Sequence, residues 1–477
     1  MTRNLPEHPA SYRDPAGFVF IRDGRVYRQV APAYADDYRL LMDSGLYEKL
    51  VAEQLLIPHE EVEAGTLLPL QLPVISYPCE WSPDQLKDAA LLTLKIMRIA
   101  IDHGMILKDA SPRNIQWLNA RPLFIDTLSF ERYDPAHPWI AYRQFCESFL
   151  FPLYLHHYFR QGIHRTLAAY PEGMPAGALL PLLPLKSRLR AGVWLHVVLP
   201  AIVVNSGKAG RAGKARPAGQ ISFDKRKLLL LIGNLEDSLR GLRTEASHAI
   251  GWSRYYSETI MSQAYVQEKE KLFREMIAAI DFGSALDLGA NDGYFSQILA
   301  EKKARVIAVD DQWACTNTLY RAAATAASEG IASPTSEGNS SRASGGHIYP
   351  LCVDIAEPTP ASGFANTERS SFTERAQCDL VVALAVVHHL VLTKNIPFGL
   401  LADYLAILTR QWLIIEFVPV SDEKASALIR DKPVFHKPYD ADAFEAHFAL
   451  LFSIEQKQLI PGTERILYLM RKKADAI

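Results

Sequence analysis

Short apolar runs alternate with helix-like segments between residues 255 and 477. In the runs almost every position is apolar, as expected for strands buried on both faces of a sheet. Two more runs flank Pro461-Gly462, which predicts an antiparallel hairpin. Strands that alternate with helices favour a parallel α/β sheet. The five expected parallel strands lie at 285–288, 305–310, 347–354, 378–390 and 412–418, and the hairpin strands at 452–458 and 465–470.

The first half of the chain has a different pattern. Ser82 and Pro83 are typical of a helix start, and the apolar residues that follow as far as Ile101 share one face of a helix. Residues 119–122 predict a hairpin turn, and 26–30 could form a strand. Further on, residues 131–275 have a mostly helical pattern.

The first apolar run in the second half leads directly into a glycine-rich turn. Its pattern is Gly289-x-Asn291-x-Gly293, and Tyr294 stands where a dinucleotide-binding turn needs a third glycine. No Gly-Lys-Ser/Thr follows, so a P-loop also fits poorly. The next strand ends at Asp310, at the spacing that places an acid beside a ribose. The turn therefore predicts a nucleotide-like cofactor other than NAD.

At this point the chain resembles the class I S-adenosylmethionine-dependent methyltransferases. The resemblance covers roughly residues 255–477 and implies a Rossmann-like seven-stranded sheet with S-adenosylmethionine as the cofactor. In that family an acid after the third strand commonly faces the adenine amino group, and the end of the fourth strand opens on the methyl group. Carried onto this chain, the implied cofactor-binding residues are Asp287, Gly289, Asn291, Gly293, Asp310, Asp354 and Ala383.

Methyl transfer from a sulfonium needs mainly a nucleophile held in line with the methyl carbon. A base helps when the acceptor is a hydroxyl or a protonated amine. His388 and His389 end the fourth strand and are the candidate bases, with Glu416 in reserve at the end of the fifth. The chain has no Asn/Asp-Pro-Pro-Tyr/Phe tetrad after the fourth strand and no Pro-Cys nucleophile, which disfavours nucleic-acid bases as acceptors. The acceptor, through an oxygen or a nitrogen, stays unidentified, with glycan-linked or small molecules as options.

A second pattern lies in the first half. Asp109 and Asn114 are five residues apart and Asp126 follows the expected hairpin, an order that resembles the catalytic loop and metal-binding Asp of protein kinases and aminoglycoside phosphotransferases. The resemblance implies that Asp109 is a base and that Asn114 and Asp126 hold a metal ion, if this region is active. However, there is no kinase-type glycine-rich loop, and Arg28 stands where a strand would carry the ATP lysine. We expect a kinase-like domain that selects or presents the acceptor. Unless this region is an active kinase, we expect no metal site.

Together, the two halves resemble long bacterial methyltransferases related to a host-specific nodulation protein. The expected organisation is a kinase-like α+β domain (1–135), a helical middle region (136–254) with a basic Gly/Ala linker at 205–220, and the methyltransferase domain (255–477). Loops at 324–346 and 356–377 are expected to be mobile insertions. Two alternatives stay open: a regulatory protein that binds S-adenosylmethionine or ATP without turnover, and a kinase-like phosphotransferase.

Composition adds limits to this picture. The chain has 51 basic and 53 acidic residues among 477, so no global field attracts it to nucleic acid or to an anionic membrane. Its five cysteines are scattered, which indicates neither disulfides nor a zinc cluster. The start lacks an apolar signal core, and the longest apolar run, 191–204, is too short to span a bilayer and is expected to be a buried helix. We therefore expect a cytoplasmic enzyme without a transmembrane segment; its oligomeric state is not predicted.

Overall fold

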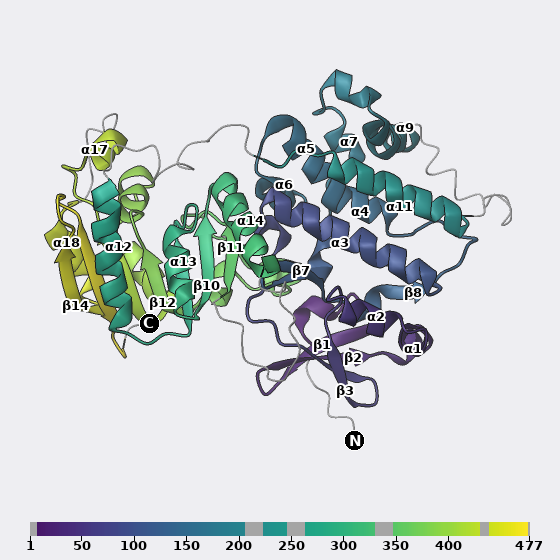
Figure 1. The fold of residues 1–477 in the computed structure, drawn as a ribbon, viewed down its shortest axis with the longest axis horizontal. Coiled ribbons are helices and arrows are strands. Elements are labelled where there is room, and N and C mark those ends of the chain that lie inside the picture. Colours follow the sequence, from purple (N-terminus) through teal and green to yellow (C-terminus); the bar gives the residue numbers. More distant parts are fainter. Residues whose placement is uncertain (1–6, 206–222, 246–262, 330–346, 430–437, 476–477) are drawn as a thin grey trace. The chain divides into compact units, whose positions relative to one another are not determined.

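The computed structural model describes residues 7–205, 223–245, 263–329, 347–429 and 438–475. The chain forms two compact units (Figure 1): residues 1–246 with 361–369, and residues 247–360 with 370–477. The boundary expected at 254/255, nearly all of the linker at 205–220 and most of the loop at 324–346 lie outside the described residues. The division into three domains stays a prediction.

The second unit is built on a seven-stranded sheet. Its order is β11-β10-β9-β12-β13-β15-β14. The first five strands are parallel, and β15 runs antiparallel to both β13 and β14. The expected hairpin across Pro461-Gly462 is therefore confirmed. The strands are β9 (Ser284–Leu288), β10 (Arg305–Asp310), β11 (Ile348–Cys352), β12 (Cys378–Ala383), β13 (Thr409–Phe417), β14 (Phe452–Leu459) and β15 (Ile466–Lys472).

Helices bury both faces of the central strands, which explains why those strands are apolar throughout. All five residues of β9 are buried. On one face, Phe273 of α12 and Phe295 of α13 share a core with alternate strand residues such as Val382. On the other, α16 packs on β12 and β13. The helices are α12 (Gln263–Ala278), α13 (Tyr294–Glu301), α14 (Trp313–Glu329), α15 (Phe372–Arg375), α16 (Phe398–Leu408), α17 (Glu423–Ile429) and α18 (Ala441–Phe448).

The first unit begins with a four-stranded antiparallel sheet of order β1-β2-β4-β3. The long helix α3 follows it, and Ser82 caps α3 by accepting a hydrogen bond from the backbone of Gln85, as expected. The hairpin through 119–122 is also confirmed, because β6 and β7 pair antiparallel around Asn119 and Ala120. The strands are β1 (Gly17–Arg22), β2 (Arg25–Val30), β3 (His59–Glu63), β4 (Thr66–Pro69), β5 (Met105–Leu107), β6 (Ile115–Leu118), β7 (Arg121–Phe124) and β8 (Phe130–Arg132).

The rest of this unit is mainly helical, as predicted, and α11 packs along α3 (Figure 1). This arrangement joins the expected middle region to the N-terminal region within one unit. The unit is thus α+β, and its likeness to a kinase stays a prediction. The helices are α1 (Ala35–Asp43), α2 (Leu46–Ala52), α3 (Pro83–Asp102), α4 (Tyr142–Phe145), α5 (Phe151–Phe159), α6 (Ile163–Ala169), α7 (Ala176–Leu179), α8 (Ala191–Val193), α9 (Leu199–Asn205) and α11 (Lys225–Arg240).

One expectation about a segment is wrong. The run 191–204 is not a fully buried helix: it is divided among α8, the π-helix η8 (Trp194–Val198) and α9, and it leaves several large apolar side chains exposed. Residues 361–369, part of the insertion expected at 356–377, group with the first unit, where Arg13 binds the buried carboxylate of Glu368 at 2.8 Å. The mobility of this insertion stays a prediction. Within the described residues, no helix combines the length and apolar character needed to cross a bilayer.

Candidate functional site

The turn after β9 adopts the backbone that its glycines allow. Gly289, Asn291 and Gly293 have φ angles of 73°, 52° and 86°, in the left-handed region that favours glycine. A Cβ atom on Gly289 would lie 2.5 Å from Val386, and one on Gly293 would lie 2.3 Å from Leu319. The spacing of the glycines therefore reflects both backbone conformation and close packing.

Asp310 ends β10, next to β9, and its carboxylate is held by this turn. The backbone N–H of Asn291 donates to Oδ2 at 2.9 Å, and the N–H of Gln312 donates to Oδ1 at 2.8 Å. Burial raises the pKa of Asp310 to about 7, and the neighbouring charge of Asp311 adds to the rise. A carboxylate has about four lone-pair sites, so each oxygen can accept one more hydrogen bond. The sequence-predicted pair of turn and acid is thus assembled.

Asp287 has a different environment at the end of β9. It is buried, and the hydroxyl of Ser296 in α13 donates to its carboxylate at 2.6 Å. Burial raises its pKa to about 6, although this hydrogen bond opposes the rise. Asp287 therefore fastens the helix after the turn to the strand before it.

The other two predicted cofactor-binding positions flank this centre. Asp354 follows β11, accepts a hydrogen bond from the N–H of Ala356 and forms an ion pair with Lys394 at 3.1 Å. Ala383 ends β12 and is paired with Leu288 of β9. The strand order reverses between β9 and β12, and open α/β sheets bind ligands at such a reversal, at the carboxyl ends of the strands.

The two candidate histidines lie just beyond β12. Ala385, between them and the strand, has a φ of 54°, a strained conformation for an L-residue that is often found at functional sites. His388 is fully buried, and neither ring nitrogen has a hydrogen-bond partner among the described residues. Burial lowers the pKa of His388 well below its usual value, and the neighbouring His389, with its ring centroid 4.2 Å away, adds to this. His389 is only partly buried, and burial lowers its pKa as well. Both rings are therefore neutral at pH 7.

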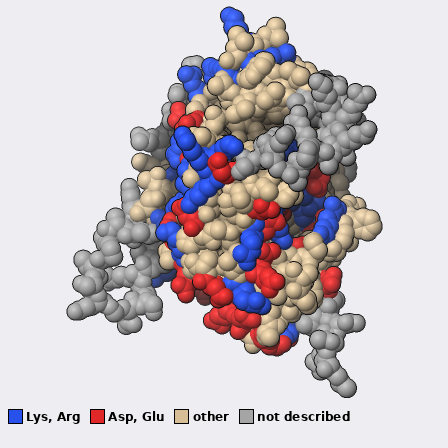
Figure 2. Space-filling model, turned by 90° about the vertical axis from the view of Figure 1, so that its right-hand side faces the viewer, with Lys and Arg blue, Asp and Glu red and all other residues tan. Residues whose placement is uncertain are grey.

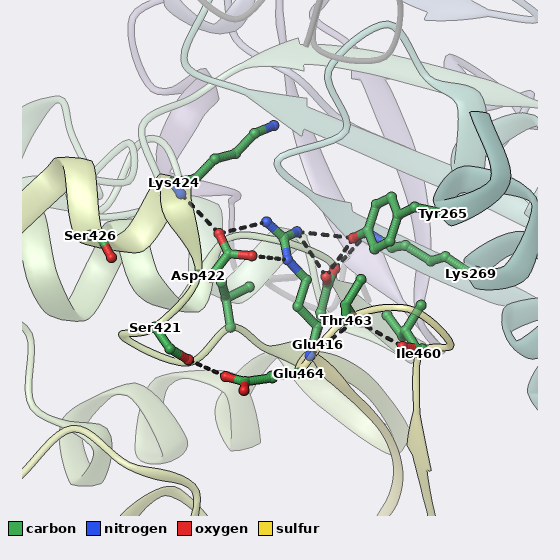
Figure 3. Close-up of polar contacts among 12 residues, drawn as sticks. Tyr265, Lys269, Glu416, Ser421, Asp422, Lys424, Ser426, Ile460, Thr463 and Glu464 are labelled. Carbon is green, nitrogen blue, oxygen red and sulfur yellow. Dashed lines mark hydrogen bonds and ion pairs between the residues drawn. The ribbon is translucent and has the colours of Figure 1, made fainter. Parts of the chain in front are cut away.

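Glu416 lies at the centre of a buried ionic network (Figure 3). Lys269 donates to Oε2 at 2.5 Å, and the hydroxyl of Tyr265 donates to Oε1 at 2.8 Å. Arg465 contacts the same carboxylate at 3.2 Å. On its other edge Arg465 binds both oxygens of Asp422, at 2.8 and 3.0 Å. Glu416, Lys269 and Arg465 are completely inaccessible to solvent.

This network makes Glu416 a poor proton acceptor. Burial alone would raise the pKa of Glu416, but the charges of Lys269 and Arg465 outweigh burial and lower the pKa to about 2. The geometry favours a structural role over the reserve base that the sequence suggested. Sequence reasoning missed Lys269 and Arg465, although one signal was present: Lys269 is a lone cation between the apolar residues Tyr265 and Phe273 on one helix face.

The first unit brings together the residues of the kinase-like pattern. Asp109 interacts with Asn114 through a side-chain hydrogen bond, and burial and the charge of Asp126 raise its pKa. Asn114 and Asp126 both bind the hydroxyl of Ser129. The cation that reaches this cluster is Arg28, whose guanidinium forms ion pairs with Asp126 at 2.7 Å and with Asp14 at 2.8 Å. The guanidinium of Arg28 is thus bound to the carboxylate of Asp126, which the resemblance assigned to a metal ion.

No known family profile matches the sequence. The chain is 29% identical over 473 residues to nodulation protein NoeA of Rhizobium meliloti (strain 1021), covering 96% of this chain and 94% of that protein.

Within the part of the chain that the structure describes, no group of three or more His, Cys, Asp or Glu side chains could hold a metal ion.

Several solved structures are similar to a little under half of the chain. Magnesium protoporphyrin IX methyltransferase from Synechocystis PCC 6803 with bound SAH matches at 15% identity and a TM-score of 0.32, over 46% of this chain and 92% of that one. N-methyltransferase NodS from Bradyrhizobium japonicum WM9 with S-adenosyl-L-homocysteine matches at 14% identity and a TM-score of 0.32, over 47% of this chain and 93% of that one. The bifunctional kinase-methyltransferase WbdD matches at 17% identity and a TM-score of 0.27, over 46% of this chain and 41% of that one. Similarity at this level does not identify an activity for this chain.

The buried network predicts an unequal response to two substitutions in α12. Lys269→Met leaves Glu416 buried with one cation fewer, and we expect it to lower the free energy of unfolding by about 3–5 kcal/mol. Arg274→Met is the control, because Arg274 pairs with Glu270 and Glu301 near solvent and such pairs contribute at most about 1 kcal/mol. Urea denaturation of the full chain measures both. Equal losses in the two variants would contradict a structural role for the network.

Proposed function

We propose that this protein is an S-adenosylmethionine-dependent methyltransferase that acts on an oxygen or a nitrogen of an acceptor. The observation that carries the proposal is the carboxylate of Asp310, held by backbone N–H groups of the left-handed turn and of Gln312 at the reversal of strand order. Two hydroxyls on neighbouring carbons of a ribose fit the two lone-pair sites that remain on this carboxylate.

The rest of the turn supports this arrangement. Gly289 and Gly293 adopt the left-handed backbone of the turn and leave room for Val386 and Leu319 to pack against it, and Asp287 fixes the start of α13. Asp354 has remaining acceptor capacity for the adenine amino group, although Lys394 competes for it. When bound, S-adenosylmethionine supplies an electrophilic methyl group. The chain itself has to orient the acceptor and exclude water.

We assign the proton-accepting role to His389 rather than to His388 or Glu416. His389 is partly exposed beside the end of β12, and its imidazole is neutral at pH 7, so it can accept a proton. His388 is inaccessible to solvent, and Glu416 is committed to Lys269 and Arg465. The acceptor that supports this chemistry is a hydroxyl or a protonated amine, glycan-linked or small.

The two alternatives differ in what the sites would do. A protein that binds S-adenosylmethionine without turnover would have the same Asp310 geometry but no use for a base at His389. Phosphotransfer in the first unit is disfavoured by one contact: Arg28 already neutralises Asp126 at 2.7 Å, so a divalent cation would have to displace a guanidinium.

Asp310→Asn should weaken cofactor binding strongly without unfolding the protein. Because burial raises the pKa of Asp310 to about 7, its ionised form destabilises the folded protein at pH 8, and a neutral side chain removes that cost. The Asn amide accepts through one oxygen only, so one of the two backbone N–H groups loses its acceptor, and we expect the two effects together to keep the thermal midpoint close to that of the wild type. Loss of two charge-assisted hydrogen bonds, each worth about 1.5 kcal/mol or more, should weaken S-adenosylmethionine at least about 100-fold. Isothermal titration calorimetry measures this loss.

The matched control is Asp311→Asn, which removes a neighbouring carboxylate that is exposed to solvent. It should keep the affinity within about threefold. If the wild-type protein binds no S-adenosylmethionine, or if the two variants bind it equally well, the assignment of Asp310 is wrong. Titration of the wild type with Mg-ATP tests the phosphotransferase alternative in the same experiment.

Cofactor affinity should also depend on pH. Ribose hydroxyls need the ionised form of Asp310, so affinity should be full well above pH 7 and should fall up to about tenfold per pH unit as pH drops below the pKa of about 7. Binding at pH 6 should therefore release a proton, which calorimetry in two buffers of different ionisation enthalpy detects. A wild-type affinity that stays flat between pH 5.5 and 8.5 would rule out this coupling.

His389→Gln should separate binding from transfer. We expect the affinity for S-adenosylmethionine to stay within about threefold, whereas transfer of a labelled methyl group to bacterial glycan and lipid extracts should fall about 100-fold or more. His347→Gln, which replaces a partly buried histidine just before β11, is the control and should transfer normally. Normal transfer by His389→Gln would remove the base from the mechanism, and binding without any transfer by the wild type would favour the non-catalytic alternative.

A further inference from the structure

A continuous stretch of the first unit exposes large apolar side chains. Leu185 and Leu189 are 74% and 85% exposed, and the indole of Trp194 is half exposed. They belong to the 3-10 helix η7 (Leu185–Leu189) and to the π-helix η8. We define the apolar face as the exposed apolar residues of this stretch: Leu182, Leu185, Leu189, Trp194, Leu195, Leu199 and Ile202.

The short helices that carry the apolar face pack against one another and bury other apolar side chains. Helix η7 contacts α8 and η8, and α7 contacts η8 and α9, so these short helices form one packed group. Inward side chains such as Leu183 and Val197 are buried in it. His196 anchors the group, since its ring binds the hydroxyl of Tyr142 and the side chain of Asn234, both at 2.7 Å. The exposed apolar residues are spread over successive short helices of this group, and η8 and α9 each have both buried and exposed apolar side chains.

Only positive charge accompanies this face in the sequence. Between Glu172 and Asp224 the chain has no acidic residue, and the described part of that interval carries Lys186, Arg188 and Arg190. Lys186 and Arg190 are exposed. In Figure 2 the upper part of the view is mainly uncharged with Lys and Arg at its top and left, whereas most of the Asp and Glu in this view lie lower down.

We propose that the apolar face docks on an anionic phospholipid surface. A short packed group that exposes leucines and a tryptophan, with exposed cations next to two of the leucines in the sequence, has the composition of an interfacial membrane anchor. We expect the apolar side chains to enter the headgroup region and the cations to bind lipid phosphates. A large exposed apolar patch with a polar rim needs such a partner. A symmetric dimer through the same face fits less well, because it would bring Lys186 and Arg190 of both copies together.

This docking is independent of the proposed methyl transfer, and vesicle sedimentation tests it on the full chain. The protein should pellet with vesicles that contain phosphatidylglycerol, pellet poorly with pure phosphatidylcholine, and dissociate as salt is raised. Leu185→Ser with Leu189→Ser, and separately Lys186→Glu with Arg190→Glu, should each lower the partition coefficient more than about tenfold. Leu450→Ser and Arg39→Glu, at exposed positions elsewhere, are the matched controls and should bind like the wild type.

Trp194 reports the orientation of the docked protein. Brominated lipids should quench part of the tryptophan fluorescence of the wild type, and Trp194→Phe should remove that quenched part while sedimentation persists. Absence of binding to anionic vesicles, or equal binding by wild type and both double variants, would overturn the proposal. A dimer in light scattering that Leu185→Ser with Leu189→Ser dissociates, without any vesicle binding, would assign the face to a second copy instead.

Discussion

The buried contact between Lys269, Glu416 and Arg465 is the constraint on which the second unit depends. Charges taken out of water are tolerated only when they compensate one another, so the elements that carry them have little freedom to separate. Those elements are α12, the end of β13 and the turn between β14 and β15. The network also reaches the candidate site electrostatically. Burial is the main cause of the low pKa of His388, and within the network Arg465 lowers this pKa further whereas Glu416 opposes the lowering.

Asp310 shows the opposite arrangement within the same sheet. It is partly buried where Glu416 is completely inaccessible, backbone N–H groups hold it instead of cations, and its pKa rises to about 7 where that of Glu416 falls to about 2. An acid that is paired with cations of the chain stabilises the fold. An acid without a counter-charge lowers the free energy of unfolding until a ligand donates hydrogen bonds to it. This contrast separates the structural carboxylate from the one that we assign to the cofactor.

The sequence was sufficient to predict most of the second unit, because its central strands are buried on both faces and therefore form unbroken apolar runs. Asp310 was predictable for a similar reason, since turn and acid are about twenty residues apart. The partners of Glu416 were not, because Lys269 and Arg465 lie 147 and 49 residues away and no local pattern pairs them. The exposure of Trp194 was also missed: an apolar run alone does not tell which of its sides meets solvent.

The same distinction between compensated and uncompensated charge applies to the first unit. Arg28 has Asp14 and Asp126 within ion-pair distance, so part of the negative charge of the kinase-like cluster is already compensated, and the cluster resembles a structural element more than an open metal site. Lys186 and Arg190 lie in a stretch without acids and beside exposed leucines, where neither their charge nor the apolar surface is satisfied by neighbours in sequence. An anionic lipid surface would supply negative charge to Lys186 and Arg190 and an apolar environment to the leucines. The same reasoning therefore disfavours a ligand at Arg28, whose charge is already paired, and favours one at the apolar face.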